Sequence, residues 1–167
     1  MLPLIFLPAL MVMQAPEPPA PALVEVSRGV YILKGVPSPA VYHELKRLKI
    51  SLVIDFRGDD EITGGLNTES AILMDQGTSY MRYALTRTPP ASDFTFIREY
   101  LRSQSFTTRV LLHCSNGNRA AAAVCPWLVL ERGMKVEAAL QICEQAGLVV
   151  PETEKAVREY LANRQRS

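Results

Sequence analysis

The sequence predicts an α/β protein built on a four- or five-stranded, mostly parallel β-sheet with helices on both faces. Short β-branched runs alternate with amphipathic helical segments from residue 24 onward, which is the pattern of strands joined by crossover helices. Two of the runs, ISLVIDF at 50–56 and RVLLH at 109–113, are apolar enough for strands buried on both faces. The 167 residues, 48% of them hydrophobic, suffice for the core of one domain.

The first half of the domain alternates in this way. A strand is predicted at Gly29–Lys34. Ser38 is a good N-cap and Pro39 a good first residue for the next helix, whose apolar face would carry Val41, Leu45 and Leu48. The polar loop RGDDEITGG follows the 50–56 strand, and a helix is then predicted over 67–76, ending at Gly77.

The second half continues the alternation. A strand is predicted over Ser79–Leu85, followed by a helix that Ser92 or Asp93 would cap. The 109–113 strand comes next. Three more helices are predicted over 120–130, 135–146 and 152–163.

The N-terminal segment differs in composition from the rest. Residues 2–13 form an apolar run, and a Pro/Ala-rich linker leads from it to residue 22. This arrangement resembles a secretory signal peptide, although no Lys or Arg precedes the apolar run. We therefore predict a leader over 1–22, a folded domain over 23–167, and an exported or periplasmic protein. The alternative is a cytoplasmic protein whose first residues take no part in the fold.

The composition argues against several classes of partner. Lys plus Arg number 18 and Asp plus Glu 17, so no bulk charge favours nucleic acid. No apolar run reaches the roughly 18 residues of a membrane span. The three cysteines include no Cys-x-x-Cys pair, so we expect no metal, and no organic cofactor is implied. The sequence does not indicate an oligomeric state.

The segment RVLLHCSNGNRAAAA at 109–123 carries the chemistry. An apolar strand leads through Cys114 and a polar turn into a helix N-terminus, where backbone amides and the helix dipole favour an anion. Ser115, Asn116, Gly117 and Asn118 would line this cradle, and glycine allows the positive φ that a tight loop needs. Arg119 supplies a planar fork for two anion oxygens. The same amides favour the thiolate of Cys114, so it becomes a candidate nucleophile.

The run HCSNGNR at 113–119, called the signature loop below, resembles the active-site loop of the cysteine-dependent protein tyrosine phosphatases. GVPSPAVYHELKRLKISLVIDFRGDDE at 35–61 and QICEQAGL further on are similar to the small bacterial dual-specificity-like phosphatases, a domain also found fused to β-lactamase-like hydrolases. The resemblance implies hydrolysis of a phosphorylated substrate through a phosphocysteine at Cys114, with Arg119 and the loop amides stabilising the transition state. It also implies that His113 hydrogen-bonds the loop backbone.

The chain departs from this pattern in three places. The loop is Cys-x4-Arg rather than the commoner Cys-x5-Arg, and Ala120 stands where the family usually has Ser or Thr. The family's general acid is an aspartate after the strand at 79–85. Here that loop reads TRTPPASD, so Asp93 is the nearest candidate acid, unless it is only a helix cap. Asp59 or Asp60 could replace it, since their loop, with Arg57 and Glu61, follows the neighbouring strand and could border the cradle.

Three functions remain open on this basis. The first is a cysteine-dependent phosphatase that hydrolyses a phosphomonoester of a protein or a small molecule. The second is a catalytically impaired module that binds phosphate or phosphoproteins, as Ala120 and the missing acid suggest. The third is a rhodanese-type sulfurtransferase, because the short loop has the length of the rhodanese loop.

Overall fold

The computed structural model describes residues 22–62 and 67–166. The leader predicted over 1–22 lies outside the described residues except for its last residue, and so does the end of the polar loop after β3. The first strand begins at Leu23. Within the described part of the chain, no helix combines the length and the apolar character needed to cross a membrane.

A five-stranded sheet forms the centre of the molecule, with the strand order β1-β2-β5-β3-β4. Its strands are β1 (Leu23–Ser27), β2 (Val30–Leu33), β3 (Leu52–Asp55), β4 (Ser79–Arg82) and β5 (Val110–His113). The neighbouring strands β2, β5, β3 and β4 are all parallel to one another. Strand β1 pairs antiparallel with β2 and is an edge strand of the sheet. The predicted mostly parallel sheet is therefore confirmed, with β1 as a strand that the sequence did not single out.

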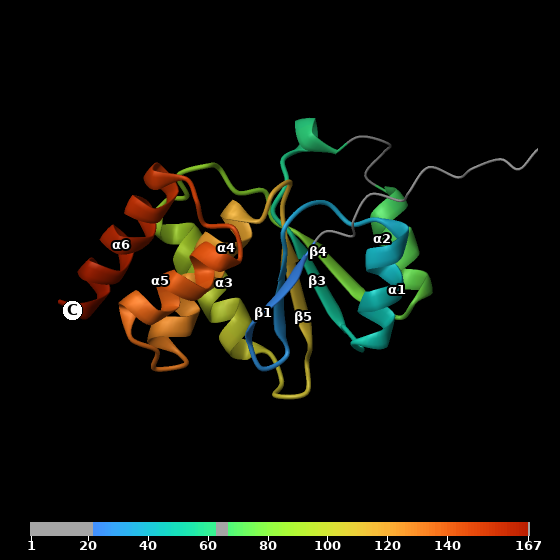
Figure 1. Ribbon diagram of the computed structural model, residues 1–167, viewed down its shortest axis with the longest axis horizontal. Coiled ribbons are helices and arrows are strands. Elements are labelled where there is room, and N and C mark those ends of the chain that lie inside the picture. The colour runs from blue at the N-terminus through green and yellow to red at the C-terminus, as the bar shows by residue number, and fades with distance from the viewer. Residues whose placement is uncertain (1–21, 63–66, 167) are drawn as a thin grey trace, which may run out of the picture.

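Helices cover both faces of this sheet, as predicted (Figure 1). The shorter pair, α1 (Pro39–Arg47) and α2 (Asn67–Asp75), packs on one face together with the short helix η1 (Asp59–Glu61) above it at the sheet edge. The other face carries α3 (Ala91–Ser103), α4 (Asn118–Leu130), α5 (Val136–Gln145) and α6 (Pro151–Gln165).

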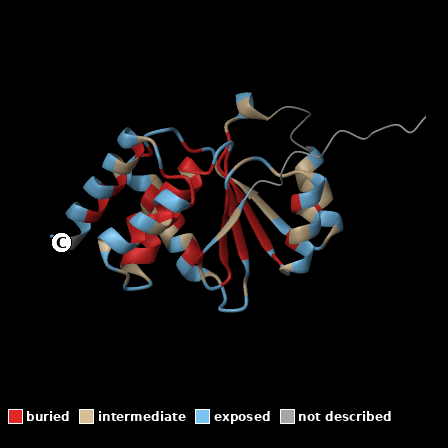
Figure 2. Ribbon diagram, in the orientation of Figure 1, coloured by how far each residue is buried: buried red, intermediate tan, exposed pale blue. Residues whose placement is uncertain are grey.

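Helix α4 is the most deeply buried helix, as Figure 2 shows. The four alanines at 120–123 are fully buried against the core. Because alanine favours helix and carries only a methyl group, this run lets the start of α4 lie close to the sheet. The position of the signature loop is thus fixed by packing on both of its sides.

The two helix starts with predicted caps turned out differently. Ser38 caps α1, and its hydroxyl accepts a hydrogen bond from the Val41 amide at 3.4 Å. The expected cap of α3 by Ser92 or Asp93 was wrong. Pro90 is the N-cap residue, because its carbonyl already accepts from the Asp93 amide at 3.0 Å. Asp93 is consequently in the first helical turn, where a carboxylate interacts favourably with the helix dipole.

The carboxyl ends of the parallel strands all lie at the same end of the sheet, and the loops that follow them meet there. In such sheets ligands bind at the carboxyl ends of the strands. The loop after β3 leads into η1, the loop after β4 leads to α3, and the loop after β5 is the signature loop. The carboxyl end of the sheet is therefore where the candidate site is assembled.

Candidate active site

The turn from β5 into α4 depends on Gly117. This residue is the N-cap of α4 and has φ +92°, a conformation that side chains disfavour. A Cβ atom placed on it would lie 2.7 Å from the carbonyl oxygen of Ala146, and Gly147 packs against it from the same segment. Gly117 is thus needed both for its backbone angle and for the close approach of the loop between α5 and α6.

We expect Gly117→Ala to lower the free energy of unfolding by about 2–4 kcal/mol, because it adds overpacking to an unfavourable φ. Gly77→Ala is a matched control. Gly77 has φ +74°, but a Cβ atom added there would meet no other atom within 4 Å, so only the backbone cost of about 1–2 kcal/mol is expected. Urea denaturation of both variants measures the difference. Equal losses in the two variants would show that the close approach to Ala146 is unimportant.

Cys114 lies beneath the signature loop and is fully buried. The amide of Gly117 donates to its sulfur at 3.2 Å, and the thiol is 3.6 Å from the Asn116 Oδ1 atom. The same Asn116 oxygen accepts from the amide of Asn118 at 3.1 Å. The sulfur therefore has two polar contacts within the loop, while Cys114 also belongs to the buried apolar core.

Arg119 projects from the first turn of α4 to the mouth of the loop. Its guanidinium donates to Glu61 through both terminal nitrogens, with Nη1 at 2.6 Å from Oε2. It also donates to the carbonyl oxygen of Leu85 at 3.1 Å and to the hydroxyl of Ser115 at 3.2 Å. Ser115 in turn donates to Glu61 at 2.9 Å. Arg119, Ser115 and Glu61 thus form one closed polar cluster.

The charges in this cluster stabilise one another. Hydrogen bonds from Arg119 are the main cause that lowers the pKa of Glu61 to about 2, although burial works against it. Burial would lower the pKa of Arg119, but its hydrogen bonds to Glu61 and the charge of Cys114 outweigh burial and raise it. Glu61 is therefore ionised at all physiological pH values. Its carboxylate binds the Arg119 guanidinium, which an incoming anion would also need to bind.

We expect Glu61→Gln to tighten the binding of vanadate or phosphate by about three- to tenfold, because a negative charge next to the anion is removed. Since the carboxyl pKa is lowered, its charge is present above the usual value of 4.5 and is lost only as pH falls through about 2. The difference between variant and wild type should therefore be constant from pH 5 to 8.

Asp59→Asn is the control for Glu61→Gln. Asp59 belongs to the same short helix, but it pairs with Arg82 and does not line the cavity. Isothermal titration with vanadate compares the two variants. Weaker binding in Glu61→Gln would show that Glu61 acts only as a support for Arg119 and does not compete with the anion.

The side chain of Asn118 connects the signature loop to two other segments. It is nearly fully buried and donates to the hydroxyl of Thr153 at 2.9 Å, which donates to the carbonyl oxygen of Arg87 at 2.7 Å. Its own oxygen accepts from the amides of Val149 and Val150, both at 3.1 Å. This side chain thus fixes the loops around the site, and no sequence signal identified Thr153 as its partner.

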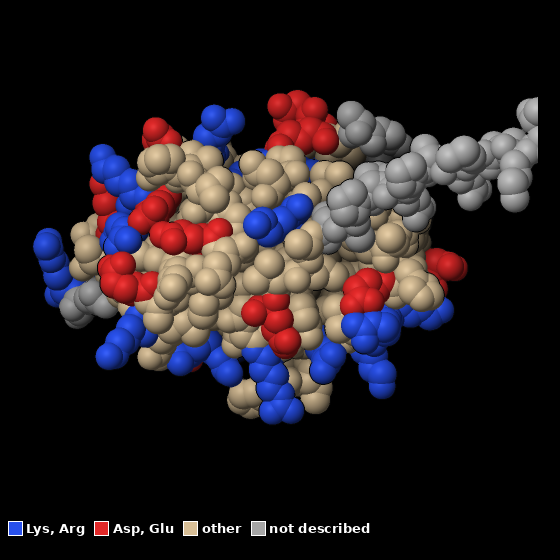
Figure 3. Space-filling model, in the orientation of Figure 1, with Lys and Arg blue, Asp and Glu red and all other residues tan. Residues whose placement is uncertain are grey.

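A cavity of about 560 Å³ opens above the signature loop. Its lining comes from the loops after β3, β4 and β5 and from the start of α6: Gly58, Asp60, Glu61, Ala84, Leu85, Thr86, Arg87, Ser115, Asn116, Asn118, Arg119 and Val150. No aromatic side chain is among these described residues. The acidic side chains of η1 stand at its rim, at the top of Figure 3.

Asp93, the predicted general acid, does not line this cavity. Its carboxylate accepts a hydrogen bond from the hydroxyl of Tyr83 at 3.0 Å. Thr86 and Arg87 occupy the part of the lining where the resembled family would place its aspartate. Among the described carboxyl groups only those of Asp60 and Glu61 face the cavity, and Asp59 is instead paired with Arg82.

His113 also differs from its expected role. The ring is fully buried on the opposite side of β5 from Cys114, because successive strand residues point to opposite faces. Its Nε2 atom lies 3.0 Å from a Glu69 oxygen and 3.8 Å from an Asp55 oxygen. The ring thus faces Asp55 and Glu69, and the expected hydrogen bond from it to the loop backbone is not formed.

Arg57 lies at the centre of this buried polar network. It donates to both carboxylate oxygens of Asp55, at 2.9 and 2.7 Å, and forms an ion pair with Glu69. The hydroxyl of Tyr80 donates to Asp55 at 2.8 Å. Burial would raise the pKa of Asp55, but the bonds from Arg57 and the charge of His113 outweigh it and lower that pKa. The network supports β3 and β5 directly below the site.

The same network holds the ligand atoms most suitable for a metal ion. One atom from each of Asp55, Glu69 and His113 lies within 4.8 Å of the others. However, the guanidinium of Arg57 already neutralises both carboxylates. The arrangement is therefore that of an ion-pair network in which Arg57 takes the place of a cation.

Comparison with solved structures shows that several phosphatases share this fold. The Tk-PTP structure in its active form has a TM-score of 0.71 at 17% identity, and the match covers 85% of this chain and 97% of that one. PTPMT1 in complex with PI(5)P has a TM-score of 0.71 at 16% identity, covering 86% and 97%.

A DUF442 protein from Shewanella putrefaciens has a TM-score of 0.68 at 17% identity, covering 87% of this chain and 94% of that one. The sequence matches no family model and no curated protein. At these identities the likeness shows the fold, so the function must be argued from the residues of this chain.

Proposed function

We propose that the protein is a phosphatase that hydrolyses phosphomonoesters through Cys114. The observation that carries the proposal is the geometry of the signature loop. The Cys114 sulfur accepts the Gly117 amide at 3.2 Å, and the Arg119 guanidinium lies at the mouth of the same loop. A sulfur nucleophile next to a bidentate anion donor is the arrangement that phosphoryl transfer to cysteine needs.

The reaction would take place in two steps. In the first, the Cys114 thiolate attacks phosphorus, the bond from phosphorus to the ester oxygen breaks, and the leaving oxygen takes up a proton. In the second, water attacks phosphorus and the S–P bond breaks, which releases phosphate and a proton and restores the thiolate. Arg119 would stabilise the charge on the non-bridging oxygens in both steps. Because Glu61 occupies Arg119, substrate has to compete with that carboxylate.

The proton for the leaving group limits the substrates that we expect. Glu61 is ionised, and Asp93 would have to leave Tyr83 to reach the cavity. Asp60 is the other carboxyl at the lining and is the better candidate by position. Loss of a well-placed general acid costs about 10²–10⁴ in rate for poor leaving groups. We therefore expect aryl phosphates to be better substrates than alkyl phosphates.

A binding module without turnover is the second candidate function. Ala120 lacks the hydroxyl that would help the thiolate leave, and it is fully buried. A human tyrosine phosphatase-like serine/threonine/tyrosine-interacting protein has the same fold, with a TM-score of 0.67 at 18% identity. The described part of the site would in that case bind phosphate without hydrolysing it.

Hydrolysis of para-nitrophenyl phosphate by the purified full chain, with and without vanadate, tests the proposal. We expect vanadate-sensitive release of phosphate. Vanadate binding without hydrolysis would instead support the binding module. Transfer of sulfur from thiosulfate to cyanide, with no phosphatase activity, would contradict both and establish the sulfurtransferase alternative.

A further inference from the structure

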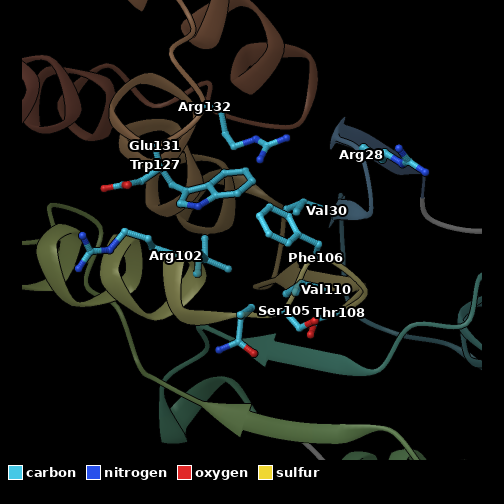
Figure 4. A pocket seen from close by; sticks show the side chains of 12 residues that line it. Arg28, Val30, Arg102, Ser105, Phe106, Thr108, Val110, Trp127, Glu131 and Arg132 are labelled. Carbon is cyan, nitrogen blue, oxygen red and sulfur yellow. The ribbon is translucent and has the colours of Figure 1, made fainter.

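A second cavity, of about 570 Å³, lies at the amino ends of the parallel strands, at the opposite end of the sheet from the candidate active site (Figure 4). Val30 and Val110, the first residues of β2 and β5, form part of its wall. The signature loop begins at His113, the last residue of β5, so the length of the strand separates the two cavities. Nothing in the proposed phosphatase mechanism uses this second cavity.

Two aromatic side chains face this cavity. Trp127 of α4 is 7% exposed, so only a small part of the indole reaches the cavity surface. Phe106, in the loop between α3 and β5, is completely exposed. Phe106 and Trp127 both line the cavity, together with Val30 and Val110 (Figure 4). A free benzyl group at the mouth of a cavity offers a flat surface on which another ring can pack.

Three arginines also line this cavity. Arg28, Arg102 and Arg132 are all exposed lining residues, and none of them has an ion pair with a described carboxylate. Arg132 lies over the indole, with its guanidinium carbon 5.5 Å from the ring centroid. Arg28 and Arg102 stand at the rim with their side chains directed to solvent (Figure 4).

The cavity contains little negative charge to balance these arginines. Glu131 is its only acidic lining residue among those described, and it lies 3.3 Å from Arg98. Lys and Arg side chains also gather along this lower edge of the molecule in Figure 3. An anionic ligand would therefore meet an uncompensated positive site.

We propose that this cavity binds a small aromatic anion, meaning a flat ring that carries a phosphate or a carboxylate group. The ring would pack on Phe106 and the exposed edge of Trp127. The anionic group would bind the guanidinium of Arg132, and also that of Arg28 or Arg102 after a rotamer change of that side chain. A volume of about 570 Å³ lies within the range of sites for ligands of nucleotide size. The site is separate from Cys114 and does not depend on the proposed phosphatase activity.

Trp127 is the single tryptophan of the chain, so its fluorescence reports on this cavity directly. Titrations use the full chain carrying Arg119→Ala, which removes the anion donor of the candidate active site. The probes are adenosine monophosphate, its two halves adenosine and inorganic phosphate, and naphthalene-1-carboxylate. The two ring-bearing anions distinguish a nucleotide from an aryl carboxylate as the source of the same chemistry.

We expect at least one ring-bearing anion to change the Trp127 fluorescence and to bind at least tenfold more tightly than adenosine or phosphate. Calorimetry of the same titrations keeps the result independent of the fluorophore. Comparable affinities for the whole ligands and for the halves would overturn the proposal. So would tighter binding of hexaglutamate than of either ring-bearing anion, which would indicate an acidic protein partner instead.

Variants locate the binding. Arg132→Gln and Phe106→Ser should each weaken it at least fivefold in calorimetry. Arg47→Gln is the control, because Arg47 is an exposed arginine at the end of α1, which packs on the other face of the sheet, and is paired with Glu44. It should change the affinity less than twofold. Equal effects of Arg132→Gln and Arg47→Gln would show that only the general charge of the protein attracts the anion.

Discussion

Replacement of Cys114 by serine is expected to lower the rate of aryl phosphate hydrolysis by at least about 10⁴-fold, which is typical of loss of a catalytic nucleophile. The reason is local. The sulfur accepts the Gly117 amide at 3.2 Å, and a serine hydroxyl in its place is far less ionised and a weaker nucleophile at neutral pH. Vanadate binding should survive, because Arg119 and the loop backbone are unchanged.

Cys125→Ala is the matched control for this variant. Cys125 is as fully buried as Cys114 but lies within α4, away from the signature loop. A hydrogen bond with Cys125 raises the pKa of Cys143, together with burial, so this pair belongs to the unreactive core. We expect activity within about threefold of the wild type. Hydrolysis that persists in Cys114→Ser, or that is lost equally in Cys125→Ala, would refute the assignment of the nucleophile.

Arg57→Met is expected to lower the free energy of unfolding by about 3–5 kcal/mol, the usual cost of leaving a buried charge without its partner. Asp55 is fully buried and Glu69 is 11% exposed, and both bind the guanidinium of Arg57. Methionine has a similar length but no donor. The loss should be evident in urea denaturation followed by circular dichroism.

The free energy of unfolding of Arg57→Met should depend on pH in the opposite direction to that of the wild type. In the wild type the pKa of Asp55 is lowered from 3.8, so its contribution is present above that value and is lost as pH falls below it. Without Arg57, burial raises the pKa instead, and the variant should gain stability as pH falls from 7 toward 5.

Arg82→Met is the control for a broken ion pair at the surface. Arg82 pairs with Asp59, whose side chain is 79% exposed, and such pairs contribute about 0–1 kcal/mol. The double variant Arg57→Met with Asp55→Asn should recover part of the lost stability. If Arg57→Met cost no more than Arg82→Met, the buried network would not be a structural support of the site.

Much of the fold could be predicted because local and tertiary signals agree. The 50–56 and 109–113 runs have the apolar character that a doubly covered strand requires, and both became central strands. Strand β1 was missed because LVEVS alternates with a polar residue and pairs antiparallel at the edge. An edge strand of this length has no signal that separates it from an extended linker.

The candidate site could be predicted in part for the same reason. Cys114 and Arg119 are five residues apart across one turn, so local geometry brings them together. The contacts of Asp93 and Glu61 depend instead on which way loops from other strands face. Asp93 turned to Tyr83, and Glu61 reached Arg119 across 58 residues of chain. Spacing alone contains no information on such contacts.

A crystal structure of the protein with vanadate tests the central claim most directly. We predict vanadium bonded to the sulfur of Cys114, with its oxygens held by the Arg119 guanidinium and the carboxylate of Glu61 displaced from that guanidinium. Vanadate bound elsewhere, with the thiol still covered and Arg119 still paired with Glu61, would contradict the account.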